Sequence, residues 1–541
     1  MLFNSLEFAV FLPIVLALYA ACGMRGPRLQ NGLLIVASYV FYGWWDPRFL
    51  FLIVASTVVD YSAALSIDRG CPTREQRWRA NGALVAAALI FATPDWQDSA
   101  RLPTTVLGWS PLLGAAAWCA FSEFGLPAFA RWPEERRRRA ALTTSLVVNL
   151  GILGFFKYFD WFAESLAAAV EATFGVQLSP FTLGLVLPVG ISFYTLQTIS
   201  YSIDVYRREL PASRSLVDFA AYVAFFPQLV AGPIERGRQL IPQFQAVRRI
   251  RPEGIRDGLW LIAWGLFKKI AIADAAAVIV NRTFGPYDDL SLMTVPEDGV
   301  RVLVAIYAFA LQIYADFSGY SDIARGTAKL LGFELMVNFR LPYFAVDPSS
   351  FWERWHISLS SWLRDYLYVP LGGNRRGRWR TGFNLSATMW IGGLWHGAAW
   401  TFVLWGVFHG AVLVIYRVLG LRRGSEDLSG PRSVLQGLVM FHLVCFGWLL
   451  FRAQNLETVR LFVASLWGQL HWTAQAGHDF YGLALIAWPL VAMQVAQWWS
   501  GRLDPIHQWP ALVRVQVWLA LGLGIAAHSG RPASEFIYFA F

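Results

Sequence analysis

Apolar runs of membrane-spanning length alternate with short polar loops along the whole 541-residue chain. About 20 consecutive apolar residues are enough for a helix to cross the hydrocarbon core of a bilayer. The candidate runs lie near residues 6–23, 31–45, 48–66, 81–94, 104–125, 141–160, 180–202, 216–232, 256–280, 300–316, 383–396, 398–418, 434–452, 481–499 and 511–528. Several runs are short or broken by Gly and Pro. The pattern predicts an all-α, polytopic membrane protein with some re-entrant segments.

The polar loops predict how the chain is oriented. Short cytoplasmic loops carry an excess of Lys and Arg. Alternate early loops hold Arg25 and Arg28, then Arg69 to Arg79, then Arg136 to Arg139, whereas the loop Pro94 to Ser99 is poor in basic residues. We therefore expect the basic loops in the cytoplasm and the N-terminus outside it. Counting the membrane spans onward along the chain places the loop Asn338 to Arg380 on the cytoplasmic side.

Composition supports a membrane protein and excludes several soluble classes. Hydrophobic residues make up 56% of the chain and charged residues only 15%, against about 25% charged in an ordinary soluble domain. The net charge of +9 follows from the basic loops, so we expect contacts with membrane lipids and no nucleic acid. The four cysteines have no CxxC spacing, and we assign them no metal or disulfide. Walker A, HExxH and GxSxG motifs are absent from the sequence.

The stretch from Ser350 to Gly410 concentrates candidate chemistry. Asp347-Pro348 and Ser350-x-x-Glu353 are a helix-start signature with a capping box. We expect one helix from about Ser350 until Pro370. At helical spacing, Trp352, His356, Leu359, Ser360, Leu363 and Arg364 share one face.

A cationic loop follows that helix. Asn374, Arg375, Arg376 and Arg378 stand among glycines, and guanidinium groups with free backbone N–H groups suit the phosphates of a nucleotide-bearing donor. The alternative is a positive-inside anchor that contacts lipid headgroups. The sequence leaves both open.

His396, in Gly-Gly-Leu-Trp-His-Gly, lies in an apolar segment. An ionisable side chain inside a membrane is a functional-site hypothesis by default. A neutral imidazole could serve as general acid and base, or it could simply make an interhelical hydrogen bond. His409 lies 13 residues further on, about 20 Å away along an unbroken helix, so we expect it at a different depth.

Three polar stretches interrupt apolar runs, at residues 187–194, 225–234 and 314–322. Each has a helix breaker beside polar side chains, which predicts broken helices around an intramembrane cavity. Within the last stretch, Asp316 and Asp322 could orient a partner, bind a cation, or pair with Arg325 and Lys329.

These motifs together resemble the membrane-bound O-acyltransferase family, in particular its bacterial polysaccharide O-acetyltransferase branch. The resemblance is carried by Asn149-Leu150-Gly151, LPVGISFYTLQTISY, FFPQLVAGPIER, ADFSGYSDIARG, NFRLPYF, FWERWHISLSSWLRDYLYVPLGGNR and GLWHGAAWTFVLWG. It also includes the final FIYFAF, where Ala540 replaces the branch's usual Gln. The final aromatic segment is expected to dock at an interface.

The resemblance implies a single membrane domain over residues 1–541, with a catalytic core at about 140–420 and additional spans at about 430–541. Helices would form a ring around a funnel or tunnel. His396 would be the catalytic residue at its constriction and His356 a second active-site residue on the cytoplasmic approach. Supporting or tunnel positions would be Trp395, Trp355, Ser360, Asp316 and Asp322.

The resemblance also implies a function. Acetyl-CoA would be the donor substrate, with no permanently bound cofactor and no metal, and the acetyl group would reach an exported, alginate-like polysaccharide through a periplasmic or membrane-anchored acetyltransferase partner. The protein would lie in a bacterial inner membrane with a periplasmic N-terminus. Two alternatives stay open: D-alanyl or other acyl transfer to a cell-envelope polymer, and a transporter of polysaccharide or lipid that performs no catalysis.

Overall fold

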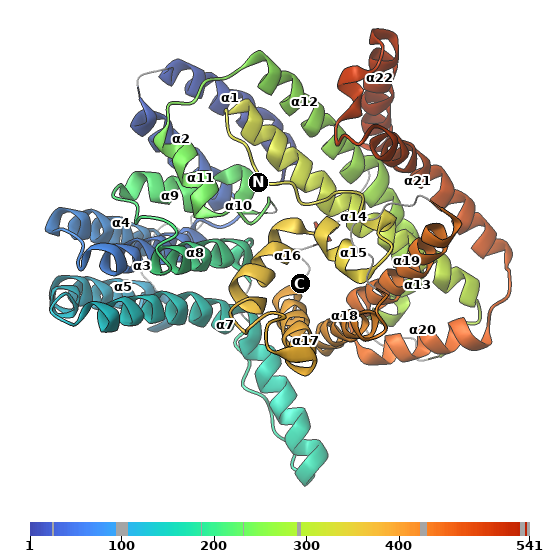
Figure 1. Ribbon diagram of the computed structural model, residues 1–541, viewed down its shortest axis with the longest axis horizontal. Coiled ribbons are helices and arrows are strands. Elements are labelled where there is room, and N and C mark those ends of the chain that lie inside the picture. Colours follow the sequence, from blue (N-terminus) through green and yellow to red (C-terminus); the bar gives the residue numbers. More distant parts are fainter. Residues whose placement is uncertain are drawn as a thin grey trace. The chain divides into compact units, whose positions relative to one another are not determined.

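A computed structural model describes residues 1–23, 26–92, 106–184, 187–230, 232–288, 294–421, 430–530 and 536–537. All regular elements within these ranges are helical (Figure 1). Eight of the described helices are long and apolar enough to cross a membrane, so the chain is an all-α, multi-pass membrane protein. The predicted basic position Arg25 and the predicted external loop Pro94 to Ser99 lie outside the described residues.

The described chain divides into two compact units. The first comprises residues 1–258 with 327–335, and the second comprises residues 259–326 with 336–541. The helices of the first unit are α1 (Leu6–Cys22), α2 (Pro27–Gly43), α3 (Leu50–Arg69), α4 (Arg74–Ala92), α5 (Val106–Ala120), α6 (Leu126–Phe129), α7 (Glu134–Phe174), α8 (Ile191–Tyr206), α9 (Leu216–Ala224), α10 (Phe226–Leu229) and α11 (Gly237–Gln245).

The second unit contains most of the motif-bearing helices. The segments α12 (Pro252–Phe267) and α14 (Gly299–Leu330) contribute to both units. The other helices of the second unit are α13 (Asp274–Asp288), α15 (Pro348–Arg354), α16 (Ile357–Leu363), α17 (Gly377–His396), α18 (Trp400–Val418), α19 (Pro431–Arg452), α20 (Leu456–Gly468), α21 (Ala474–Ser500) and α22 (Ala511–His528).

A buried carboxylate joins three helices of the first unit. Asp60 on α3 accepts hydrogen bonds from Ser145 Oγ (2.5 Å) and Asn149 Nδ2 (2.9 Å) on α7, and from Ser202 Oγ (3.5 Å) on α8. In Figure 1 these helices lie side by side. Lipid gives packed helices no hydrophobic drive to associate, so interhelical hydrogen bonds of this kind help to hold them together.

Two of the three predicted helix breaks are present. Residues 187–190 are not helical and Phe225 separates α9 from α10. Gly190 has a φ of 78°, and a Cβ there would lie 2.5 Å from the carbonyl oxygen of Leu229, so only glycine fits. The third predicted break is wrong, because α14 runs unbroken through residues 314–322.

Charge pairing explains why α14 tolerates its polar residues. Asp322 pairs with Arg325 (3.1 Å), which was one of the three alternatives, and also with Lys268 (2.7 Å). Asp316 pairs with Lys269 at 3.0 Å. Lys329 pairs with Glu334 instead of a predicted aspartate. Lysines of the π-helical turn Lys268–Ala273, which follows α12, therefore neutralise both carboxylates. The aspartates can then be accommodated within an unbroken α14.

The prediction of one helix from Ser350 to Pro370 is also wrong. Asp347, not Ser350, is the N-cap: its carboxylate accepts from the backbone N–H of Ser349 and Ser350, and Ser350 completes the capping box. The helix then stops at Arg354, and α16 begins at Ile357. His356 occupies the corner with φ 43° and ψ 54°, a left-handed conformation that is uncommon outside glycine.

Helices α17 and α18 form an antiparallel hairpin held by glycines. Gly406 lies beside Met389, Gly410 beside Ser386, and Gly382 beside Val414. At Gly397 any side chain would collide with the ring of Phe402. Small residues allow this close backbone approach, which is the usual basis of helix association in membranes. Residues after His396 therefore return along α17, and His409 does not lie at the expected distance of 20 Å.

We predict that Gly406→Ala destabilises the protein by about 1–3 kcal/mol, because the new Cβ would lie 2.5 Å from the Met389 carbonyl oxygen. Gly382→Ala is the matched control: its nearest neighbour atoms are 3.8 Å away, and replacing a helical glycine should then be neutral or stabilising by up to about 1 kcal/mol. Melting temperatures in detergent compare the two variants. Equal effects would show that the hairpin does not depend on this contact.

Candidate functional site

His396 is the last residue of α17 and is 5% exposed. Aromatic rings surround it: the centroid distances are 5.0 Å to Trp395, 5.0 Å to Trp405 and 5.2 Å to Phe451. The C-terminal end of a helix carries partial negative charge, which favours a cation placed there. The C-terminal end of α17 therefore favours a positive charge on the His396 imidazole when that ring takes up a proton.

The second predicted histidine lies close to the first. The Trp395 ring is 5.9 Å from the His356 ring and 5.0 Å from the His396 ring, so one indole stands against both imidazoles. His356 is 1% exposed. Burial lowers the pKa of His356 to about 3, and the ring is therefore neutral near pH 7.

Main-chain hydrogen bonds hold the His356 corner in its strained conformation. The carbonyl oxygen of Asn338 accepts from the Ile357 N–H (3.0 Å), and the Arg354 carbonyl accepts from the Arg340 N–H (3.0 Å). The Asn338 side chain accepts from the Ser358 N–H (3.3 Å) and donates to Ser321 Oγ (3.0 Å) on α14. A left-handed non-glycine residue persists only where its surroundings determine it, and here the Asn338 segment does so.

His409 belongs to the same cluster of rings. Its centroid is 4.7 Å from Trp405 and 5.2 Å from Trp352. Trp405 thus contacts both His409 and His396, so the two imidazoles are closer together than the 20 Å expected for an unbroken helix. The cause is the turn at Gly397, which the unbroken-helix assumption ignored.

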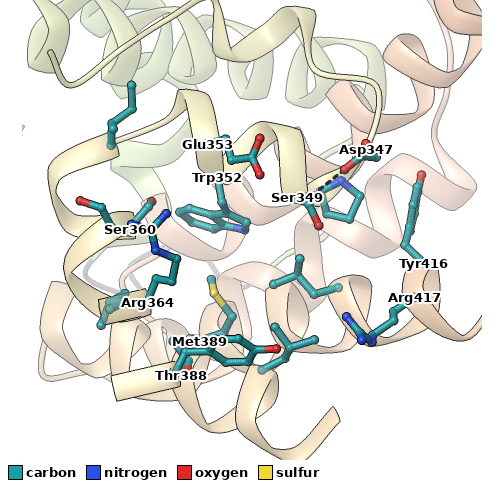
Figure 2. A pocket seen from close by; sticks show the side chains of 17 residues that line it. Asp347, Ser349, Trp352, Glu353, Ser360, Arg364, Thr388, Met389, Tyr416 and Arg417 are labelled. Atoms are coloured by element: carbon teal, nitrogen blue, oxygen red, sulfur yellow. Dashed lines mark hydrogen bonds between the residues drawn. The ribbon is translucent and has the colours of Figure 1, made fainter. Parts of the chain in front are cut away.

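A pocket of about 310 Å³ opens between α15, α16 and the α17–α18 hairpin. Figure 2 shows the polar side chains Glu353, Ser360, Arg364, Tyr416 and Arg417 around it, with Trp352 and Met389 among its walls. Trp352 connects the pocket to the buried rings: its ring centroid is 5.6 Å from that of Trp405, and the Trp405 centroid is 5.0 Å from that of His396. The pocket therefore ends two aromatic rings away from the buried histidine.

The predicted supporting residues are divided among different surroundings. Ser360 lines the pocket and its hydroxyl donates to the Trp355 carbonyl oxygen (3.0 Å). The Trp355 ring packs on Trp448 and Phe339, at 4.7 and 5.0 Å. Asp316 and Asp322 are in the ion pairs of α14 described above.

The predicted cationic loop is exposed and does not line the pocket. Asn374, Arg375, Arg376 and Arg378 are all exposed. The loop is nevertheless close to the pocket, because Gly373 lies against the ring of the pocket residue Tyr368 and its carbonyl accepts from Asn384 Nδ2 (2.9 Å).

Sequence reasoning missed Tyr416 and Arg417. They come from the far end of α18, and the hairpin brings that end back beside the start of α17, where the cationic loop is found. A tight turn at Gly397, between two apolar runs, was the signal that could have located them.

Comparisons with known proteins agree with the motifs. A family model described as MBOAT, membrane-bound O-acyltransferase family, matches residues 207–422. The chain is 39% identical over 477 residues to the probable alginate O-acetylase AlgI of Azotobacter vinelandii, which covers 87% of this chain and 79% of that protein. It is 31% identical over 491 residues to the peptidoglycan O-acetyltransferase of Helicobacter pylori, covering 85% and 78%.

More distant similarity covers half of the chain. The teichoic acid D-alanyltransferase of Bacillus subtilis is 26% identical over 280 residues, which is 49% of this chain and 68% of that protein. The family match, the extensive relatives and the membrane-spanning helices lead to one conclusion: the chain belongs to the membrane-bound O-acyltransferase family and is a multi-pass membrane acyltransferase.

Proposed function

We propose that this acyltransferase transfers an acetyl group from cytoplasmic acetyl-CoA towards the hydroxyl groups of an exported, alginate-like polysaccharide. The observation that supports this most directly is the geometry around His396, a buried imidazole at a helix C-terminus near a pocket that Arg364 and Arg417 line together with Asp347 and Glu353. The acetyl group and the alginate-like acceptor are suggested by relatives that are named alginate O-acetylases, 38–39% identical over 84–87% of this chain.

The donor would enter at the basic end of the α17–α18 hairpin. Arg364 and Arg417 line the pocket, and the loop with Arg375, Arg376 and Arg378 is next to it. Guanidinium groups bind phosphate oxygens by paired, charge-assisted hydrogen bonds. The phosphates of acetyl-CoA would remain at this end while its long thiol-bearing arm reaches past Trp352 towards His396, which is about 28 Å along α17 from Gly377.

His396 would act as the general base. It would take the proton from an acceptor hydroxyl, whose oxygen then bonds to the thioester carbonyl carbon, while the C–S bond breaks and the thiolate leaves with a proton returned by the imidazole. In the alternative route, the imidazole nitrogen first accepts the acetyl group and passes it on. Both routes use the same residue and the same enclosure.

His356 would act as a neutral group beside Trp395. An imidazole whose pKa lies at about 3 remains uncharged while donor and acceptor bind. It could hold a reacting group by hydrogen bonding without introducing charge into the aromatic enclosure.

The acetyl group would leave on the periplasmic side, to a periplasmic or membrane-anchored acetyltransferase partner that modifies the polymer. With the basic loops in the cytoplasm, the protein would lie in a bacterial inner membrane with its N-terminus in the periplasm.

D-alanyl transfer is the second candidate, because two relatives are named teichoic acid D-alanyltransferases. Their similarity covers only 42–49% of this chain, against 85% for the peptidoglycan O-acetyltransferase. Acetyl transfer is therefore the stronger proposal.

We predict that His396→Ala lowers acetyl transfer by about 100-fold or more, because general acid and base catalysis is lost. The assay supplies labelled acetyl-CoA to membranes that contain the protein and the products of its neighbouring genes. His442→Ala is the control, since His442 is on α19 and bonds to Tyr307. Equal labelling of polymer by wild type and His396→Ala would instead favour a transporter.

We predict that His356→Gly abolishes transfer and lowers the melting temperature less than His356→Ala does, because both lose the buried ring but only glycine adopts the left-handed conformation without strain. Circular dichroism and transfer rates test the two effects separately. A destabilised variant that keeps full activity would mean that His356 has only a structural role.

We predict that Arg417→Glu raises the KM for acetyl-CoA about tenfold, because one charge-assisted hydrogen bond to phosphate is lost. Arg375→Glu and Arg376→Glu test the adjacent loop in the same assay. Arg460→Glu is the control, because that exposed arginine on α20 pairs with Glu457. An unchanged KM in Arg417→Glu would exclude this pocket as the donor site, and an unchanged KM in the loop variants would leave those residues as topology anchors.

A further inference from the structure

Two neighbouring buried lysines organise the middle of the second unit. Lys268 Nζ contacts Asp322 Oδ2 (2.7 Å) and Ser318 Oγ (2.9 Å), whereas Lys269 Nζ contacts Asp274 Oδ1 (2.8 Å) and Asp316 Oδ1 (3.0 Å). Both belong to the π-helical turn Lys268–Ala273. Turns of this kind occur often at functional sites, yet acyl transfer as proposed above uses neither lysine.

The chain approaches these ion pairs closely. A Cβ at Gly265 would lie 2.6 Å from the Gly319 carbonyl oxygen, and one at Gly319 would lie 2.8 Å from the Gly265 carbonyl oxygen. The backbones of α12 and α14 therefore meet at these glycines. This contact places the lysines directly against the carboxylates and fixes the turn of α14 that carries Asp316 and Phe317.

The segment Phe536–Ile537 docks on the same turn of α14. The Ile537 N–H donates to Asp316 Oδ2 at 2.8 Å, so this carboxylate accepts from the backbone with one oxygen and binds Lys269 with the other. Phe536 is fully buried, and its ring centroid is 4.1 Å from Tyr320 and 6.1 Å from Phe317.

Phe317 connects this docking point to the candidate site. Its ring stands edge-on to the His356 ring, with the centroids 4.6 Å apart. Phe536 therefore contacts a ring that contacts His356. Because interiors are closely packed, the loss of a supporting ring is felt by its neighbours.

Other parts of the region after residue 500 reinforce the attachment. Asp504 accepts from Trp260 Nε1 on α12 (3.2 Å) and lines, with Lys268 and Asp322, a polar cavity of about 40 Å³. Gly524 on α22 lies against the ring of Phe267. Asp504 and Gly524 thus contact α12 and the π-helical turn that follows it.

We propose that Phe536–Ile537 is a positioning element of the acyl-transfer site: anchored on Asp316, it supports Phe317 and thereby the orientation of the His356 ring. This role rests on the proposed function to the extent that His356 serves acyl transfer. The proposed acyl-transfer chemistry assigns no role to the aromatic FIYFAF motif, and the present proposal assigns one to its first two residues. Its residues 538–541 lie outside the described residues, and the proposal concerns Phe536 and Ile537 alone.

The experiment uses the full-length protein in detergent and compares Ile537→Pro, which lacks the N–H donated to Asp316, with the matched Ile537→Val. Phe536→Ala removes the supporting ring, and Phe536→Leu restores part of its volume. The first readout is the rate at which diethyl pyrocarbonate modifies His356, followed by mass spectrometry. The second is the steady-state rate of acetyl transfer by the same variants in the membrane assay described above.

We expect Ile537→Pro and Phe536→Ala to raise the modification rate of His356 by roughly threefold or more, because the ring loses packed neighbours. The kcat should fall by about tenfold or more with an unchanged KM for acetyl-CoA, since small misplacements of site groups reduce rate. Phe536→Leu should restore part of the rate. Phe333→Ala is the control: it removes a buried ring in the first unit, packed on Phe225 and Phe244, and should leave His356 reactivity unchanged.

The proposal is overturned if Ile537→Pro matches Ile537→Val in both readouts. It is also overturned if Phe333→Ala increases His356 reactivity as much as Phe536→Ala does, because the effect would then be general loosening. A wild-type protein that transfers no acetyl group would contradict the proposed function, yet the reactivity of His356 would still decide the positioning role.

Discussion

The close approach of α17 and α18 is the contact on which the candidate site depends. With glycine at positions 393 and 406 the two backbones touch, and Gly397 leaves room for the Phe402 ring. The chain reverses within three residues after His396. The reversal places a helix C-terminus at the histidine and brings Trp405 and His409 back beside it. Larger residues would separate the helices and open the aromatic enclosure, because lipid offers no hydrophobic force that would press them together again.

The second constraint concerns the backbone around His356. A capped helix begins normally at Asp347, but the chain stops after two turns and holds His356 in a left-handed conformation. The partners that stabilise this corner are main-chain and amide groups of Asn338 and Arg340, which lie outside the helix. Such a strained backbone persists only where the surrounding structure holds it in place. The strained residue His356 contacts Trp395, and Trp395 in turn contacts the buried His396.

Exposed charges and enclosed histidines occupy different parts of the second unit. The exposed arginines lie at one end of the α17–α18 hairpin, near the pocket, whereas His396 at the other end is enclosed by rings. The lysines of the π-helical turn are neutralised by aspartates within 3.0 Å, as buried charges must be. The exposed arginines and the ring-enclosed His396 therefore lie in different parts of the second unit.

Much of this arrangement could be predicted from the sequence. The helical class, the positions of the eight described helices that are apolar enough to span a membrane, the breaks near Gly190 and Phe225, and the apolar surroundings of His396 depend on local properties. These properties are the length of apolar runs and the conformations open to Gly and Pro. Other features were decided only by tertiary structure. His356 lies outside a helix because the Asn338 carbonyl accepts the Ile357 N–H. Asp316 and Asp322 remain in a continuous helix because they pair with lysines that are about 50 residues away in sequence. His409 lies near His396 because α17 and α18 pack as a hairpin. In each case the determining partner is distant along the chain, so no local pattern could contain it.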